Sequence, residues 1–191
     1  MPARNDAALD FLMTRRSVPA KTLTAPGPNR AEAENLLTAA ARTPDHGKLE
    51  PWRFVALERP AIERMIGQIE ACGARLGKSE EDITKALAHY RNAPLAVAVV
   101  ESPVASEKIP VSEQSYSTGA VCLALLNASL ASGWGANWLS GWFSHDPEFC
   151  RIAFDMAEYE RVAGIIVIGT AKSAPPDRPR PDVSLKTIWI S

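Results

Sequence analysis

The sequence predicts an α+β domain in which helices cover a β-sheet, and two patterns support this prediction. Stretches with apolar residues at three- and four-residue spacing alternate with short runs of β-forming residues. Their order is helix, helix, strand, helix, helix, strand, helix, strand, helix, strand, which predicts a mixed sheet flanked by helices. Because 191 residues can bury one substantial core, we expect a single domain over residues 1–191.

The N-terminal half shows clear signals for the ends of its elements. Helices are expected at residues 6–16, from 29 to before Pro44, from 60 to Gly77 and from 79 to before Pro94, with a strand at 52–57. Asn29 can cap the second helix while Glu32 reaches back to it, and Ser79 with Asp82 repeats this pattern.

The C-terminal half contains the most apolar segments. Residues 95–100 are apolar at every position, as in a strand covered on both faces, and a further strand is expected at 162–168. The helix at 113–132 is apolar around most of its circumference, so we interpret it as a dimer helix. A strand ending at Trp138 should follow it. The irregular tail at 175–191 is suited to wrapping over a partner subunit.

Composition excludes several classes of partner. The formal net charge of -1 leaves no excess of basic residues for a nucleic acid or an anionic membrane. No Asp, Glu, Lys or Arg lies between Glu113 and Asp146, but the solidly apolar part is shorter than the ~20 residues of a spanning helix. The N-terminus lacks a secretion signal, so a cytoplasmic protein is expected. Cys72, Cys122 and Cys150 lack redox or zinc spacing and are expected as buried free thiols.

Familiar catalytic and nucleotide-binding motifs are missing from the sequence. There is no Gly-x-Ser-x-Gly turn, no Walker loop and no Gly-x-Gly-x-x-Gly after a strand. A nicotinamide cofactor would therefore not bind in the Rossmann manner.

Three clusters of polar and aromatic residues are candidates for a binding site. Arg15-Arg16-Ser17 offers two guanidinium groups and a hydroxyl to a phosphate, although a solvated helix end would look the same. Arg42-Thr43-Pro44-Asp45-His46, followed by Pro51-Trp52, lies on a proline-framed loop. Trp138-Leu139-Ser140-Gly141-Trp142 could line a planar ligand, although tryptophans are also typical of a core.

In their order and spacing these clusters resemble the nitroreductase family, in particular its short single-domain branch. The resemblance extends from Leu9 to about Thr170 and includes Asn92-Ala93-Pro94 and Gly133-Trp134-Gly135. It implies an intertwined homodimer that holds FMN at the subunit interface. Hydride would pass from NADH or NADPH through the flavin to a nitroaromatic, quinone or similar electron-poor acceptor.

The resemblance also implies a role for each cluster. Arg15, Arg16 and Ser17 would bind the phosphate and ribityl chain, and Arg42 and His46 would reach the flavin from the partner subunit. Trp138, Leu139 and Ser140 would line the phosphate and ring region. The nicotinamide would lie against Ala128, Ser129, Leu130, Ala131, Ser132 and Gly133. No residue is expected to be catalytic, because the flavin itself carries the reaction.

Two positions depart from the family pattern. Leu139 stands where relatives often carry an arginine, and Glu50 precedes Pro51-Trp52 where glutamine is common. The first departure removes one expected phosphate contact. Arg178, Arg180 or Lys186 in the tail could replace it.

Two other functions stay open from the sequence. One is flavin binding or flavin remodelling without NAD(P)H turnover. The other is a metal-dependent hydrolase using Asp45, His46, His145 and Asp146, which lacks the support of a helical His pair or a carboxylate cluster. His145-Asp146 is instead expected to cap a helix, and no metal site is predicted.

Overall fold

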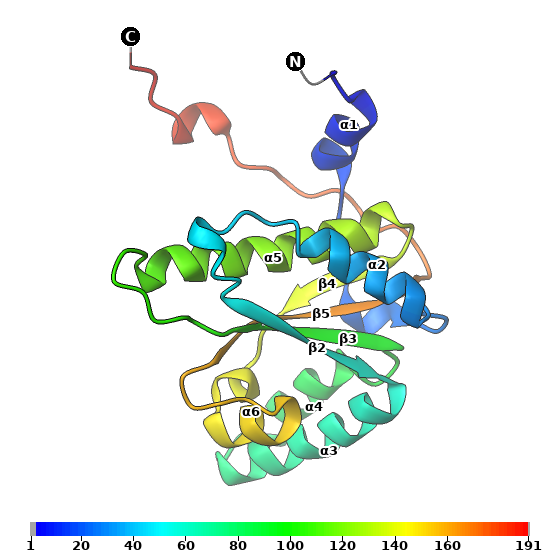
Figure 1. The fold of residues 1–191 in the computed structure, drawn as a ribbon. Helices are drawn as coiled ribbons and strands as arrows, with labels where there is room; N and C mark the ends of the chain where they lie inside the picture. The colour runs from blue at the N-terminus through cyan, green and yellow to red at the C-terminus, as the bar shows by residue number, and fades with distance from the viewer. Residues whose placement is uncertain (1–2, 191) are drawn as a thin grey trace.

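The computed structural model describes residues 3–190, and its α+β architecture is the predicted one. A sheet lies between two layers of helices, with α2 and α5 on one face and α3, α4 and α6 on the other (Figure 1). The helices are α1 (Asp6–Thr14), α2 (Arg30–Ala40), α3 (Arg59–Arg75), α4 (Glu80–Ala88), α5 (Val111–Ala131) and α6 (Pro147–Phe154). The strands are β1 (Leu23–Thr24), β2 (Trp52–Glu58), β3 (Leu95–Glu101), β4 (Gly135–Leu139) and β5 (Arg161–Ala171).

The strand directions refine the expectation of a mixed sheet. The order is β1-β5-β3-β2 with β4 also paired to β5, and each of the four pairings among residues 3–190 is antiparallel. Two helices, α3 and α4, connect β2 to β3. The second helix brings the chain back to the end of the sheet at which β2 finishes, so β3 runs antiparallel to β2. One helix, α5, connects β3 to β4, so these strands run in the same direction, but β5 separates them. Parallel strands are therefore present without being neighbours.

Both faces of the sheet are buried, as the unbroken apolar run at 95–100 predicts. Side chains of β3 and β5 alternate between two hydrophobic clusters because successive residues of a strand point to opposite faces. Val97, Val99 and Ile166 pack with α2 and α5, whereas Ala98, Val100 and Ile165 pack with α3 and α6. Cys72, Cys122 and Cys150 are buried free thiols, as expected.

The predicted caps stabilise the helix starts. Asn29 and Glu32 form the reciprocal capping box of α2. Ser79 accepts a hydrogen bond from the Asp82 amide at the start of α4, and Asp146 caps α6. β1 was not predicted, because two residues give no periodicity to read.

Helix α5 is buried on one side only. Val121, Cys122 and Leu125 are fully covered by the chain, whereas Tyr116 and Leu123 remain exposed. Among residues 3–190, no helix has both the length and the apolar character to cross a bilayer. The exposed side of α5 is available to another protein surface.

The two ends of the chain lie apart from the body. α1 contains no buried residue, and it projects beyond the α2 and α5 layer together with the tail (Figure 1). Leu12, Met13, Ile188 and Trp189 are all more than half exposed. These segments therefore present apolar side chains that their own chain does not cover.

A buried carboxylate connects the edge strand β2 to the start of β5. Arg53 donates from Nε and Nη2 to the two oxygens of Glu160 at 2.7 and 2.6 Å. The Ala157 amide donates to the same carboxylate. The Arg53 hydrogen bond is the largest of the effects that lower the pKa of Glu160 to about 2.

We predict that this pair makes stability depend on pH in the acid range. Since the folded pKa lies below the ordinary value of 4.5, ionised Glu160 stabilises the fold above pH 4.5, and this stabilisation is lost as the pH falls towards 2. Glu160→Gln should therefore lower the free energy of unfolding by about 2 kcal/mol at pH 7 and by much less near pH 2. Urea unfolding at several pH values measures this, with the exposed Glu158→Gln as control. If Glu160→Gln lowered the free energy of unfolding by the same amount at every pH, the pH dependence would not come from Glu160.

Candidate functional site

The first predicted cluster forms a compact positive site after α1. The helix ends at Thr14, so Arg15 begins an extended segment, and Arg15 Nη2 donates to Ser17 Oγ at 3.0 Å. Arg15 Nε is buried and has no hydrogen-bond partner within residues 3–190. Burial, followed by the charges of Arg180 and Arg16, lowers the pKa of Arg15. An anion bound here would accept a hydrogen bond from this unsatisfied donor and would offset the repulsion among the positive charges.

The tail supplies the third arginine of this site. Arg16 Nε and Nη2 donate to the Pro176 carbonyl at 3.1 and 3.0 Å, which brings the tail alongside the cluster. Arg180 Nη2 lies 3.5 Å from the Arg15 carbonyl and 3.3 Å from Asp177. Of the three tail residues considered as a replacement for the missing arginine, Arg180 is the one that influences Arg15.

Hydrogen bonds hold this cluster beside β4. The Val18 amide donates to the Ala136 carbonyl at 2.9 Å, and Asn137 Nδ2 donates to the Val18 carbonyl at 2.7 Å. The structure thus brings the first and third predicted clusters together, although they are more than 100 residues apart in sequence.

The residues of the third cluster point in different directions. The Trp138 indole lies against Gly164 of β5, where an added Cβ would be 1.9 Å from Trp138 Nε1. Leu139 packs into the core on the α3 and α6 face, and Ser140 is exposed. The Leu139 side chain has neither a charge nor a hydrogen-bond donor, so it cannot take the place of an arginine at a phosphate. Gly164 was missed by the sequence analysis, although a glycine inside a strand is a signal for close approach by another group.

The second cluster lies on a loop held by the first half of α5. His46 Nδ1 is 2.7 Å from Glu113 Oε2, and Ser117 Oγ donates to the Pro44 carbonyl at 2.9 Å. Arg42 is exposed just after α2. No hydrogen bond or ion pair within residues 3–190 joins this loop to the arginine cluster. In one chain the two clusters are separate surfaces.

The predicted nicotinamide region covers the last turns of α5 and the turn after it. Ala128, Ala131 and Ser132 line a cavity of about 350 Å³ with residues of α2 and Trp134. Ser129 is fully buried and donates its hydroxyl to the Leu125 carbonyl, so its side chain is not available to a ligand. Leu130 is half-buried, and Gly133 forms the turn with a φ of 85°.

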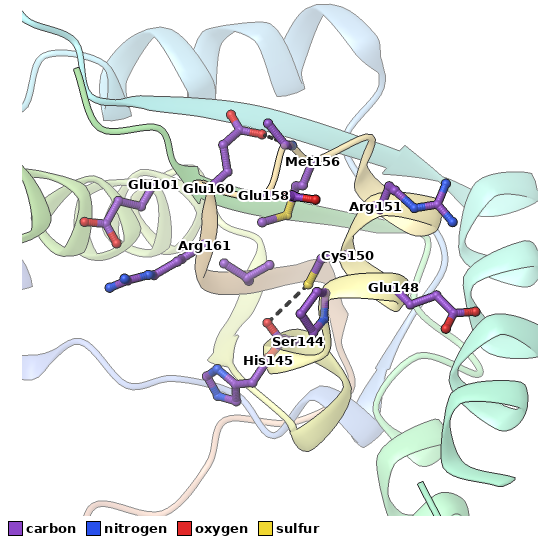
Figure 2. A pocket seen from close by; sticks show the side chains of 13 residues that line it. Glu101, Ser144, His145, Glu148, Cys150, Arg151, Met156, Glu158, Glu160 and Arg161 are labelled. Atoms are coloured by element: carbon purple, nitrogen blue, oxygen red, sulfur yellow. Dashed lines mark hydrogen bonds between the residues drawn. The ribbon is translucent and has the colours of Figure 1, made fainter. Parts of the chain in front are cut away.

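Figure 2 shows another cavity, of about 530 Å³, between α6 and the start of β5. Cys150, Met156 and Val162 form its apolar part. None of the predicted flavin residues lines it, and its Glu160 is already paired with Arg53. This cavity is separate from the candidate site.

The geometry gives no support to a metal-dependent hydrolase. Within residues 3–190, no three His, Cys, Asp or Glu side chains gather closely enough to hold a metal ion. Asp146 accepts hydrogen bonds from the Phe149 amide and from Arg75. It is a helix cap, as predicted.

Comparison with known proteins identifies the family. Residues 12–170 match the nitroreductase family. A relative from Escherichia coli K12, named "Putative NAD(P)H nitroreductase YdjA", is 34% identical over 163 residues, which are 85% of this chain and 87% of the relative. The chain belongs to the nitroreductase family. The sequence resemblance is thereby confirmed.

Solved structures share the nitroreductase fold over nearly the whole chain. A nitroreductase-like family protein from Bacillus cereus aligns with a TM-score of 0.78 and 21% identity, covering 100% of this chain and 98% of the other. An FMN-dependent nitroreductase from Clostridium difficile R20291 aligns with a TM-score of 0.69 and 17% identity, covering 95% and 98%. The nitroreductase-like α+β fold is therefore confirmed.

Proposed function

We propose that this nitroreductase binds FMN and transfers hydride from NADH or NADPH to a nitroaromatic, quinone or similar electron-poor acceptor. The observation that carries the proposal is the unsatisfied Arg15 Nε within a cluster of three arginines. Family membership supports it, because the Clostridium difficile protein of the same fold is described as FMN-dependent and the Escherichia coli relative is named for NAD(P)H.

The residues present fit the phosphate of FMN. Arg15 offers its free Nε, Ser17 offers a hydroxyl, and Arg16 and Arg180 add positive charge nearby. Guanidinium groups bind phosphate in a two-pronged geometry, and the dianion would relieve the repulsion among them. Arg180 would replace the arginine that the family often has at the position of Leu139.

We further propose a homodimer in which two subunits build each flavin site. The arginine cluster and the loop with Arg42 and His46 are separate in one chain, so a second chain can bring them to the same ligand. The exposed apolar residues of α1, α5 and the tail offer the surface that such association would bury. The end of the tail, with Ile188, Trp189 and Ile190, would lie over the partner subunit.

When bound, FMN supplies the hydride-transfer chemistry, and the protein supplies binding and electrostatics. The arginine cluster would fix the phosphate end, and Trp138, beside Gly164, would provide an apolar wall. Arg42 of the second subunit would offer hydrogen-bond donors that favour added negative charge, and His46 of that subunit would present a ring nitrogen to the flavin. The cavity at Ala128, Ala131 and Ser132 would accept the nicotinamide.

Steady-state kinetics test the proposed reaction. The FMN-loaded protein should oxidise NADH or NADPH with a quinone or a nitroaromatic as acceptor. Because residues 3–190 contain no separate dinucleotide-binding fold, donor and acceptor should use one site in turn. Initial-rate plots at several fixed acceptor concentrations should then be parallel. Tight FMN binding without oxidation of either nicotinamide would instead support the flavin-binding alternative. Intersecting lines would rule out the shared site.

Substitution of Arg15 tests the phosphate assignment. Arg15→Ala removes a charge-assisted hydrogen bond of about 1.5–3 kcal/mol, so FMN should bind roughly 10- to 150-fold more weakly. Arg15→Lys should recover part of the loss, because an ammonium keeps the charge but not the two-pronged geometry. Arg180→Ala should also weaken FMN binding, whereas Arg151→Ala on α6 should not.

Riboflavin, which lacks the phosphate, is the matched ligand control. Its affinity, measured by flavin fluorescence titration, should hardly change in the Arg15 and Arg180 variants. An equal loss for riboflavin and FMN would show that these arginines act on the fold and not on the phosphate.

A further inference from the structure

The contact between His46 and Glu113 joins a predicted flavin residue to a residue with no assigned role. His46 lies on the loop after α2, and Glu113 lies in the first turn of α5, 67 positions later. The 2.7 Å distance joins His46 Nδ1 to Glu113 Oε2. Because an ionised carboxylate can only accept hydrogen bonds, Nδ1 must carry the proton.

This contact determines what the other ring nitrogen can do. With Nδ1 protonated, Nε2 of a neutral imidazole is an acceptor, and Nε2 of an imidazolium is a donor. In either state Nε2 is the nitrogen left for a ligand, and the carboxylate fixes the orientation of the ring. The side chain of His46 is 63% exposed, so it is accessible from outside its own chain.

The loop itself does not depend on Glu113. Ser117 Oγ donates to the Pro44 carbonyl at 2.9 Å, and Thr118 Oγ1 donates to the Pro51 carbonyl at 3.2 Å. These bonds hold the backbone on both sides of His46. Within residues 3–190 the hydrogen-bond partner of the Glu113 carboxylate is the His46 imidazole, so we expect Glu113 to act on that side chain.

The backbone around His46 also has an unusual conformation. Gly47, Lys48 and Glu50 have φ values of 74°, 56° and 49°. Left-handed conformations at residues other than glycine are uncommon and cluster at binding sites. These φ values are consistent with a binding role for the loop.

We propose that Glu113 is a positioning residue that orients His46 and selects its tautomer, so that Nε2 faces the FMN bound by the partner subunit. The inference rests on the proposed FMN function and adds a residue to it. Glu113 acts through His46 and does not touch the flavin.

Nuclear magnetic resonance tests the orientation independently of catalysis. The chain contains only three histidines, at 46, 89 and 145, so His46→Gln assigns the ring signals by removing one set. In the unmodified protein at a pH where His46 is neutral, ¹⁵N shifts should show a proton on Nδ1 and none on Nε2. Glu113→Gln should shift the tautomer population towards Nε2–H, because an amide can donate as well as accept.

Affinity and coupling then test the link to FMN. The contact between His46 and Glu113 is partly exposed, so Glu113→Gln should weaken FMN binding by about two- to fivefold. Glu107→Gln on the loop before α5 is the control for lost charge. The double variant Glu113→Gln/His46→Gln should bind FMN no more weakly than His46→Gln alone. That non-additivity is the signature of one residue acting through another.

The outcomes separate this inference from the proposed function. If the unmodified protein binds no FMN, the proposed function fails. Normal FMN binding with additive losses in the double variant, or an unchanged tautomer in Glu113→Gln, would overturn the role of Glu113 alone. A loss of thermal stability in Glu113→Gln equal to that in Ser117→Ala would also overturn it, because Glu113 would then support the loop.

Discussion

The repulsion among Arg15, Arg16 and Arg180 is the constraint on which the rest of the site depends. These arginines are drawn from the two ends of the chain, and at Arg15 the largest unfavourable contribution is burial, followed by the charges of Arg180 and Arg16. Asp177 compensates only in part, since it lies 3.9 Å from Arg16 and 3.3 Å from Arg180. The fold therefore holds an electrostatic arrangement that a bound dianion would stabilise. A phosphate is the simplest ligand that matches this charge and the two-pronged guanidinium geometry.

The second constraint is that, in the proposed function, one chain holds only part of each FMN site. The arginine cluster lies beside β4, whereas His46 and Arg42 lie on a loop held by the start of α5. α1 has no buried residue, and the end of the tail is among the most exposed apolar segments. A second subunit would cover these apolar residues and bring the two halves of the site together, so dimer formation and FMN binding should be linked.

The sequence predicted the local features well because they depend on local chemistry. Asn29 and Asp146 form the expected caps, and the unbroken apolar run at 95–100 is a strand buried on both faces. Contacts between distant segments could be predicted only in outline, since Arg178, Arg180 and Lys186 of the tail were all candidates for the phosphate site. Neither the approach of Arg180 to Arg15 nor the pairing of Glu113 with His46 leaves a periodic signal. Leu139 points to the α3 and α6 face because of the register of β4 with β5, and a one-residue change in register would turn it to the other face.

Subunit complementation tests most directly whether two chains build each FMN site. Arg15→Ala and Arg42→Ala each remove one half of the proposed site, so each variant dimer should bind FMN weakly. A mixed dimer would contain one site with both residues intact and one with neither. After the two variants are dissociated together and reassociated at random, about a quarter of the FMN sites should regain the unmodified affinity and NAD(P)H oxidation. No recovery in verified mixed dimers would show that Arg15 and Arg42 of the same chain serve one site, and it would contradict the shared interface.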